Sequence, residues 1–390
     1  MRIATIAAAA AVLFVAGAVG ASAETIKIGL IAPMTGPFAP NGKQMVAGAQ
    51  LYIAEHGDMV GNNKIELVIK DDGGVPDNSK RLAQEAVVND GVKFLMGFGL
   101  TPIALAVAPI ATEAKVPAII TLAGTSIITE KSPYFVRTSF TLPQSAVIIA
   151  DWAAKNGIKK VVTMVSDYAP GQDAEKAFIE RFKAGGGETI DSLRVPLQNP
   201  DYAPFLQRAA DAKPDAVFIF VPASQGGVVM KQFVERGLDK AGIKVIGTGD
   251  VVDDDVLNGM GDTVIGSVTA GNYSAAHPSE MNKAFVAAIK AANNGLRPNF
   301  VAVHTYDGVH LVYAALEKTG GDTNGEKLIE AMKGMAWESP RGPISIDPET
   351  RDIIQNIYIR KVERGADGAL YNVEFATFEA VKDPVKAAAK

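Results

Sequence analysis

Short apolar runs alternate along the chain with longer segments in which apolar residues recur every three or four positions. The runs are continuous in Ile, Val and Leu, which is typical of parallel strands buried on both faces, and the segments between them fit the helices that connect such strands. The first runs lie at 25–32, 64–71, 92–98 and 116–123, and the connecting segments at 42–57, 78–90 and 102–114. This pattern predicts a doubly wound α/β domain.

The same alternation begins again in the middle of the chain. Four further apolar runs lie at 161–166, 188–197, 215–222 and 243–249. Two long helical stretches follow, at 278–295 and 302–320, before a tail that is rich in strands. A second α/β domain is therefore predicted.

No flexible Gly/Ser linker separates the two predicted domains. Short extended pieces occur instead at 137–144 and 269–276, and a third lies within 344–359. We expect two doubly wound parallel-sheet lobes joined by three crossover hinge strands, because several parallel crossings permit closure about one axis while resisting twist. The expected division is a first lobe of residues 24–140 and 275–347 and a second lobe of residues 141–274 and 348–390.

Composition and charge narrow the classes of function. The chain has 390 residues, of which 48% are hydrophobic, a formal net charge of −5 and no cysteine. This length suits about two domains with large cores, and their stability comes from packing without disulfides. The mildly acidic balance contains no basic block, which argues against nucleic acid as a partner.

Residues 1–23 have the pattern of a secretory signal peptide. Arg2 supplies a positive charge, an Ala/Val/Leu/Phe stretch follows, and Ala21-Ser22-Ala23 places small residues at a cleavage site. A membrane anchor is the alternative, and it is disfavoured because the apolar stretch is short and interrupted by Gly. We expect cleavage after Ala23 and a mature protein outside the cytoplasm.

Candidate binding residues lie in the loops that follow the predicted strands. In open α/β sheets the ligand binds beyond the carboxyl ends of the strands, where helix N-termini present backbone N–H groups. These loops are rich in Gly, hydroxyls and amides, contain a few aromatic residues, and are poor in Lys, Arg and His. They comprise residues 32–42, 71–78, 97–102, 122–126, 166–173, 221–227 and 247–254.

The fourth apolar run ends in Ala123, Gly124, Thr125 and Ser126, which are too small to pack a core. The hydroxyls of Thr101 and Thr125, together with backbone N–H groups, suit a carboxylate without any cationic side chain. Helix capping by Thr125 and Ser126 explains the same residues. Both interpretations stay open from the residues alone.

The sequence predicts no catalytic residue, no metal and no cofactor. It has no G-x-S-x-G motif and no Cys, and its four His lie outside the predicted strand-end loops. The acidic run 253–255 lacks the alternating spacing and the Gly of an EF-hand loop. A secreted α/β hydrolase or amidase with Ser126 or Ser166 as nucleophile is an alternative from another class, and it lacks a His base.

The chain resembles the type I periplasmic solute-binding proteins, in particular the branched-chain amino-acid (Leu/Ile/Val) branch that serves ABC importers. The resemblance covers essentially the whole mature chain and is clearest in residues 26–55, 66–87, 165–178, 306–321 and 337–362. It implies two α/β lobes joined by three crossover strands that enclose a ligand when they close, a periplasmic location, and delivery of the solute to membrane ABC permease subunits. We expect a monomer.

The resemblance also implies site residues in the first lobe. Thr101, Ala123 and Thr125 match positions that grip the carboxylate and amino groups of the ligand. Phe38 matches the aromatic residue of the first strand-end loop, and Phe300 matches an aromatic residue near the mouth of the cleft.

In the second lobe, Tyr168 and Gly171 match a ligand-contacting loop, and Tyr273 matches a further aromatic residue near the cleft mouth. Asp250 is the nearest candidate for the acid that pairs with a ligand ammonium group. One usual position of that acid is occupied by Gly249, so the chain departs from the pattern of amino-acid binders here.

The predicted function is that of a non-enzymatic receptor which binds one small carboxylate-bearing solute between two lobes. An aliphatic, branched-chain amino acid is the ligand that the resemblance favours, and a benzoate-type aromatic acid is the alternative because of the weak match at the ammonium position. The sensing lobes of a transcription regulator or membrane receptor would require a further segment, and the predicted signal peptide argues against that class.

Overall fold

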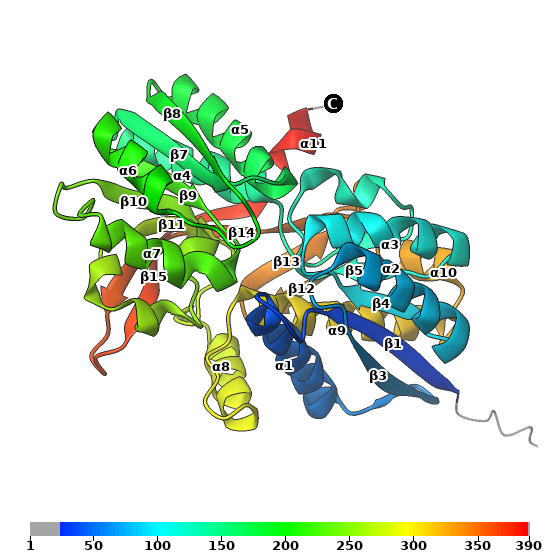
Figure 1. Cartoon of the computed structure of the whole chain (residues 1–390). Helices are drawn as coiled ribbons and strands as arrows, with labels where there is room; N and C mark the ends of the chain where they lie inside the picture. Colours follow the sequence, from blue (N-terminus) through cyan, green and yellow to red (C-terminus); the bar gives the residue numbers. More distant parts are fainter. Residues whose placement is uncertain (1–23, 389–390) are drawn as a thin grey trace, which may run out of the picture.

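The computed structural model describes residues 24–388, so the predicted signal peptide lies outside the described residues. The described chain forms two lobes that lie side by side, each built on one sheet flanked by helices (Figure 1). The first sheet uses the N-terminal strands, and the second uses strands from the middle and the end of the chain. The predicted two-lobed α/β fold is confirmed.

The first sheet has six strands in the order β2-β3-β1-β4-β5-β6. Neighbouring strands are parallel except for the short β2–β3 pair. The strands are β1 Thr25–Ala32, β2 Met59–Val60, β3 Asn63–Asp71, β4 Phe94–Gly97, β5 Ala118–Ile120 and β6 Phe135–Arg137. β4 and β5 are buried along their whole length, which explains their continuous apolar sequence.

Helices flank the first sheet in two groups, since α1 packs against α8 and α9 whereas α2 packs against α3. They are α1 Ala39–His56, α2 Pro76–Glu85, α3 Thr101–Ala114, α8 Glu280–Ala292, α9 Phe300–Thr319 and α10 Gly325–Met332. A π turn at Ala86–Asp90 extends α2, and a 3₁₀ turn at Ser126–Glu130 follows β5. α9 is capped by Asn299, whose side chain accepts hydrogen bonds from the N–H groups of Val301 and Ala302.

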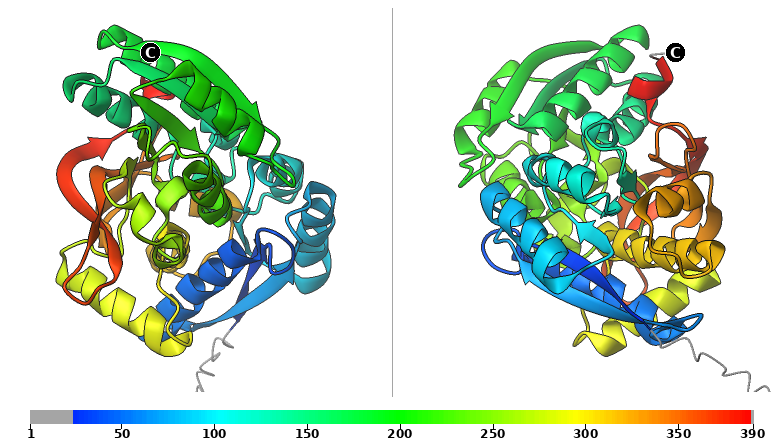
Figure 2. Two further views of the ribbon diagram at one scale, coloured as in Figure 1. Left: turned by 60° about the vertical axis from the view of Figure 1, so that its left-hand side comes forward. Right: turned by 90° about the vertical axis from the view of Figure 1, so that its right-hand side faces the viewer.

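The second sheet contains five parallel strands in the order β11-β10-β9-β7-β8, continued by antiparallel β14, β13 and β12, with β15 paired to β14. The parallel strands are β7 Lys160–Ser166, β8 Glu188–Val195, β9 Ala216–Phe220, β10 Lys244–Thr248 and β11 Val268–Gly271. The others are β12 Ala336–Ser339, β13 Gly342–Ile346, β14 Ile353–Arg364 and β15 Leu370–Val381. The β14–β15 pair, orange to red, runs along one side of the molecule (Figure 2).

The helices of the second lobe are α4 Leu142–Lys155, α5 Ala169–Ala184, α6 Ala203–Ala212, α7 Gly226–Glu235 and α11 Pro384–Ala388. Short 3₁₀ turns lie at Ala223–Gln225, Gly249–Val252, Leu257–Met260 and Asp262–Val264. None of the helices in the described part of the chain is long and apolar enough to cross a bilayer.

Alternate residues of the central strands belong to two apolar clusters. Val217 and Ile219 of β9 lie in a cluster confined to the second lobe. Phe218 and Phe220 face the other cluster, which continues through α4 into the first lobe. Burial on both faces is what the continuous apolar runs predict.

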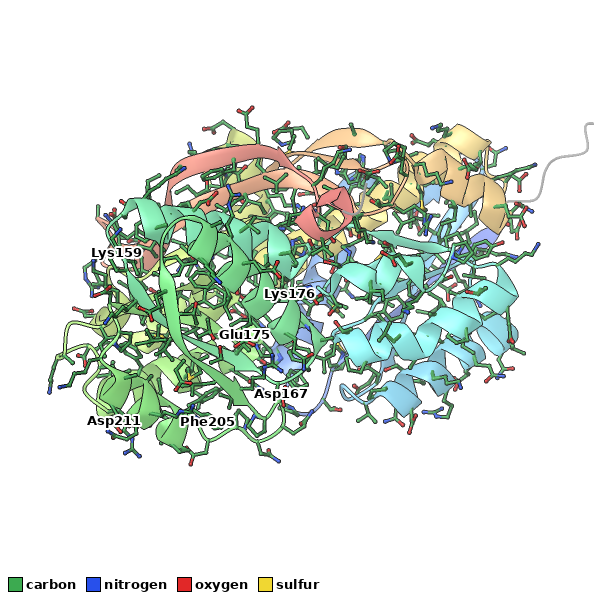
Figure 3. The ribbon with its side chains drawn as sticks, turned by 90° about the horizontal axis from the view of Figure 1, so that it is seen from above. Lys159, Asp167, Glu175, Lys176, Phe205 and Asp211 are labelled. Carbon is green, nitrogen blue, oxygen red and sulfur yellow. The ribbon has the colours of Figure 1, made fainter. Side chains whose placement is uncertain are left out.

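The parallel strands of the second lobe point their carboxyl ends toward the first lobe. Seen from above, Lys159 and Asp167 mark the two ends of β7, and the Asp167 end lies nearer the first lobe (Figure 3). The strand-end loops of the two sheets therefore meet between the lobes.

The chain passes between the lobes three times, between β6 and α4, between β11 and α8, and between α10 and β14. The third passage includes β12 and β13, which pair with β14 in the second sheet. The predicted number of crossings is therefore confirmed, whereas the predicted domain boundaries stay a prediction.

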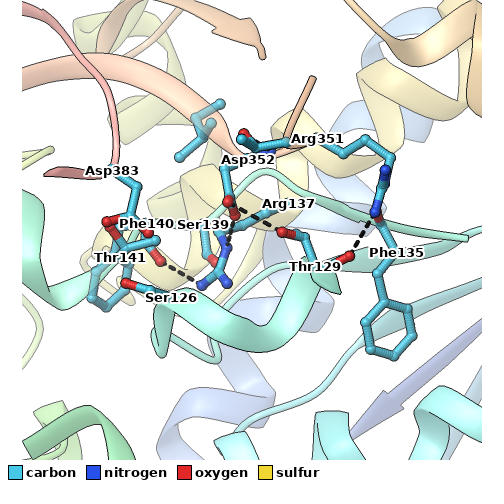
Figure 4. Close-up of polar contacts among 12 residues, drawn as sticks. Ser126, Thr129, Phe135, Arg137, Ser139, Phe140, Thr141, Arg351, Asp352 and Asp383 are labelled. Atoms are coloured by element: carbon cyan, nitrogen blue, oxygen red, sulfur yellow. Dashed lines mark hydrogen bonds and ion pairs between the residues drawn. The ribbon is translucent and has the colours of Figure 1, made fainter. Parts of the chain in front are cut away.

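A buried arginine ties two of these crossings together. Arg137 pairs with Asp352 at 2.7 Å and donates to the carbonyl oxygens of Ala123, Thr125 and Phe140 at 2.7–2.8 Å (Figure 4). Both members of the ion pair are almost fully buried. A buried pair of this kind fixes geometry more than it adds net stability, so the hinge and the strand-end loop after β5 form one unit.

Candidate ligand-binding cleft

A narrow cleft lies between the carboxyl ends of the two sheets, and residues of both lobes line it. The first lobe contributes Asn41, Gly99, Leu100, Thr101, Leu122, Ala123, Gly124 and Phe300. The hinge segment and the second lobe contribute Phe140, Leu142, Tyr168, Pro170, Phe220, Pro222, Ala223 and Asp250.

The wall from the first lobe presents hydroxyls and main chain. Thr101 Oγ1 and Thr125 Oγ1 lie 2.9 Å apart and share one hydrogen bond, and both side chains are buried. Thr101 is the first residue of α3, which has no side-chain cap at its N-terminus. An uncapped helix N-terminus with hydroxyls beside it attracts anions.

Aromatic rings form the sides of the cleft. Phe140 and Phe300 meet edge to face, with their ring centroids 5.6 Å apart. On the second lobe, Tyr168 and Phe220 lie nearly parallel, with centroids 6.1 Å apart. Flat apolar sides of this kind suit a planar or aliphatic ligand body.

Asp250 is the acid in the cleft lining. Asp250 is the second residue after the end of β10, with Gly249 between them. Its Oδ2 accepts a hydrogen bond of 2.9 Å from Thr248 Oγ1. Burial raises the pKa of Asp250 to about 6, while the Thr248 bond and the charge of Arg360 act in the opposite direction. Burial also raises the pKa of Tyr168, and the nearby Asp250 adds to that shift.

A second, smaller compartment adjoins the cleft. It shares Phe140, Asp250 and Phe300 with the cleft, and its other lining residues are Ser145, Gly249, Gly271, Asn272 and Arg360. Its distinguishing feature is the buried guanidinium group of Arg360.

The main chain and neighbouring strands hold Arg360 in place. It donates to Gly249 O at 3.1 Å and Thr269 Oγ1 at 3.2 Å, and it also donates to Tyr273 O. A Cβ at Gly249 would lie 2.4 Å from Nη2, and one at Gly271 would lie 2.9 Å from Cζ. Only residues without a side chain leave room for the guanidinium here.

The structure brings five of the predicted site residues into the cleft lining, namely Thr101, Ala123, Tyr168, Asp250 and Phe300. Thr125 is not in the cleft lining, but its hydroxyl is hydrogen-bonded to that of Thr101, which is. The binding roles of these residues stay predictions.

Three predicted residues lie outside the cleft lining. Phe38 is buried at the start of α1 and packs in the first-lobe core. A Cβ at Gly171 would lie 2.0 Å from Ser166 O, so this glycine lets α5 approach the end of β7 closely. Tyr273 is buried beside Phe285, with ring centroids 6.4 Å apart.

Sequence reasoning missed Phe140, Phe220 and Arg360. Phe140 belongs to the predicted hinge segment, and Phe220 is the last residue of β9, so neither was sought in a loop. Arg360 comes from the middle of β14 in the strand-rich tail. The sequence signal that could have identified Arg360 is a cationic residue within an otherwise apolar strand.

Two other findings bear on the predicted chemistry. No His hydrogen-bonds Ser126 or Ser166 in the described chain; the four histidines contact Tyr52, Asn272 or Glu374 instead. Within residues 24–388, no group of three or more His, Asp or Glu could hold a metal ion.

Two α/β lobes with a cleft between their strand ends define a two-lobed binding protein. A family model described as "Periplasmic binding protein" matches residues 25–369, so the chain belongs to the periplasmic binding protein family. The Leu/Ile/Val-binding protein homolog 6 of Brucella suis biovar 1 is 44% identical over 382 residues, which cover 97% of this chain and 98% of the relative.

Two solved structures from Rhodopseudomonas palustris are similar to this chain. The solute-binding protein of an ABC transporter from strain BisB5, in complex with 3,4-dihydroxybenzoic acid, has 68% sequence identity and a TM-score of 0.91, covering 93% of this chain and 99% of that one. Another solute-binding protein, in complex with 4-hydroxybenzoate, has 44% identity and a TM-score of 0.90 with the same coverage.

These similarities confirm the predicted class. The chain is a type I periplasmic binding protein of the branched-chain amino-acid family and the solute-binding component of an ABC transporter.

Proposed function

We propose that this protein captures a small aromatic carboxylate of the benzoate type and delivers it to the membrane subunits of an ABC permease. The observation that carries the proposal is the cleft with aromatic sides: Phe140 and Phe300 on one side, Tyr168 and Phe220 on the other. A benzene ring between them gains offset or edge contacts beyond its area burial. The hydroxybenzoates held by the two R. palustris proteins support the same ligand class.

The carboxylate of the ligand binds at the first lobe. There it meets the hydroxyls of Thr101 and Thr125 and the N-terminus of α3. These groups supply hydrogen-bond donors and a favourable dipole without a cationic side chain at that end of the cleft.

An aliphatic α-amino acid is the second candidate, supported by the relatives named Leu/Ile/Val-binding proteins. An α-ammonium group would have to pair with Asp250. Arg360 lines the compartment next to Asp250, so the ammonium would also lie near a guanidinium of the same charge. This arrangement favours the aromatic acid.

Contacts between the lobes support a ligand-driven closure. Hydrogen bonds that join the lobes include Ser126 N to Asp173 Oδ2 at 3.1 Å, Asn299 Nδ2 to Asp253 Oδ2 at 2.6 Å, and Gln44 Nε2 to Asp255 Oδ2 at 3.4 Å. A ligand that touches both lobes only in the closed form shifts the population toward that form. We propose a periplasmic monomer, released by cleavage after Ala23, that returns its solute unchanged and is not an enzyme.

A ligand screen tests this function. Benzoate, 4-hydroxybenzoate and 3,4-dihydroxybenzoate should each raise the melting temperature, because a ligand at 100 times its Kd stabilises the folded state by about 2.7 kcal/mol. Leu, Ile and Val at the same concentration serve as the comparison. Larger shifts with the amino acids than with any aromatic acid would overturn the proposed ligand class. Recovery of chemically unchanged ligand after incubation checks the absence of catalysis.

A further inference from the structure

Asp250 occupies the junction between the cleft and the second compartment, because it lines both. Its side chain is almost wholly buried, and Thr248 donates to one of its two carboxylate oxygens. Arg360 lines the same compartment, yet its guanidinium is already bonded to Gly249 O, Tyr273 O and Thr269 Oγ1. Asp250 therefore has a cation nearby that helps it stay ionised without being bound to it.

Asp250 and Thr101 line the same cleft from opposite lobes. Thr101 lies at the start of α3 in the first lobe, and Asp250 follows β10 in the second. A benzoate whose carboxylate binds at Thr101 directs the opposite edge of its ring toward the second lobe. Asp250 is an acceptor on that side of the cleft.

We propose that Asp250 accepts a hydrogen bond from a hydroxyl group on the ring, and that the protein thereby selects hydroxylated benzoates over unsubstituted ones. This inference rests on the proposed function and specifies the ligand within it. A hydrogen bond from a phenol to a carboxylate is charge-assisted and about twice as strong as a neutral one. A ligand without the hydroxyl forgoes this hydrogen bond and so binds less tightly.

The protonation of Asp250 gives the selection a pH dependence. The charged and titratable groups around Asp250 are Arg360, Tyr168 and Asp253, with Thr248 as a neutral donor. Burial raises the pKa of Asp250 to about 6. The carboxylate form, which is the stronger acceptor, therefore prevails above that pH, and the preference for a phenolic hydroxyl weakens as the pH falls through it.

The test compares ligands that differ in one group. Calorimetric titration measures the affinities of benzoate, 4-hydroxybenzoate and 4-methylbenzoate for the wild type, Asp250→Asn and Asp250→Ala. The methyl compound matches the hydroxyl compound in size and lacks the donor. For the wild type we expect 4-hydroxybenzoate to bind about 100-fold more tightly than 4-methylbenzoate. The ratio should fall in Asp250→Asn and approach one in Asp250→Ala.

Thr101→Val is the matched control, because it alters the carboxylate end and should weaken all three ligands by a similar factor. An unchanged ratio in a cooperatively melting Asp250→Ala protein would overturn the inference. If neither Asp250 variant folds, the wild-type affinity ratio of 4-hydroxybenzoate to 4-methylbenzoate is compared near pH 5 and near pH 8. An equal ratio at both pH values also overturns the inference. Failure of every benzoate to bind the wild type would instead overturn the proposed function.

Discussion

Thr101 and Thr125 share one hydrogen bond between their hydroxyls at the N-terminus of α3. Thr101→Val keeps the size of the side chain and removes the donor, so we expect binding to weaken by about 1–2 kcal/mol, roughly tenfold. Titration calorimetry with 4-hydroxybenzoate checks the value. Thr263→Val, at an exposed 3₁₀ turn of the second lobe, should leave the affinity unchanged. Equal affinities for both variants would place the carboxylate elsewhere.

Individual site residues were predictable where they directly follow a parallel strand. Thr101, Tyr168 and Asp250 meet this condition, because parallel strands present their carboxyl ends at one edge of a sheet. Arg360 does not, since it reaches the compartment beside the cleft from an antiparallel strand near the end of the chain. No local pattern encodes which strand will lie beside Gly249 and Gly271.

At the scale of elements, the close approach of β14 to β11 depends on two glycines. A Cβ at Gly271 would lie 2.9 Å from Cζ of Arg360, so Gly271→Ala must displace the guanidinium. We expect the free energy of unfolding to fall by about 1–3 kcal/mol, as for other overpacked core sites. Chemical denaturation measures this change.

Gly227→Ala is the control for that substitution. Gly227 lies in α7, where nothing is within 4 Å of an added Cβ, so the change should be neutral or stabilising. A Gly271→Ala protein as stable as Gly227→Ala would show that Arg360 can move without cost.

Most elements were predictable because their patterns are long or continuously apolar. The runs predicted at 161–166 and 215–222 correspond to β7 and β9 within two or three residues. The strand β13 lies in the tail that was predicted to be rich in strands, whereas β12 was not predicted. Only the last of the four residues of β12 is buried, so the apolar signal there is weak.

At the scale of the whole molecule, the lobes meet through buried carboxylates. Asp253 accepts from Asn299, and Asp255 accepts from Gln44. Burial raises the pKa of both acids, and repulsion from neighbouring acids, including Asp254, adds to the shift. The closed form therefore holds protons more tightly than an open form in which these groups are hydrated.

A raised pKa means that the stabilisation of the closed form is present at low pH and is lost as the pH rises through the raised value. We expect the ligand-free protein to have a smaller radius of gyration near pH 5 than near pH 8, measured by small-angle scattering. Asp253→Asn should reduce this difference, whereas Asp211→Asn on the outer helix α6 should preserve it. Identical scattering at both pH values would contradict the expectation.

The contacts of Arg137 have a practical consequence for biosensor design. This side chain donates to the carbonyl oxygens of Ala123, Thr125 and Phe140. The strand-end loop after β5 and the hinge segment between β6 and α4 therefore move as one rigid body. A fluorescent reporter attached there would disturb recognition and motion together. One dye on the outer surface of each lobe would report solute capture as a change in energy transfer. Because the chain has no native thiol, engineered cysteines would be its only sites for a thiol-reactive dye.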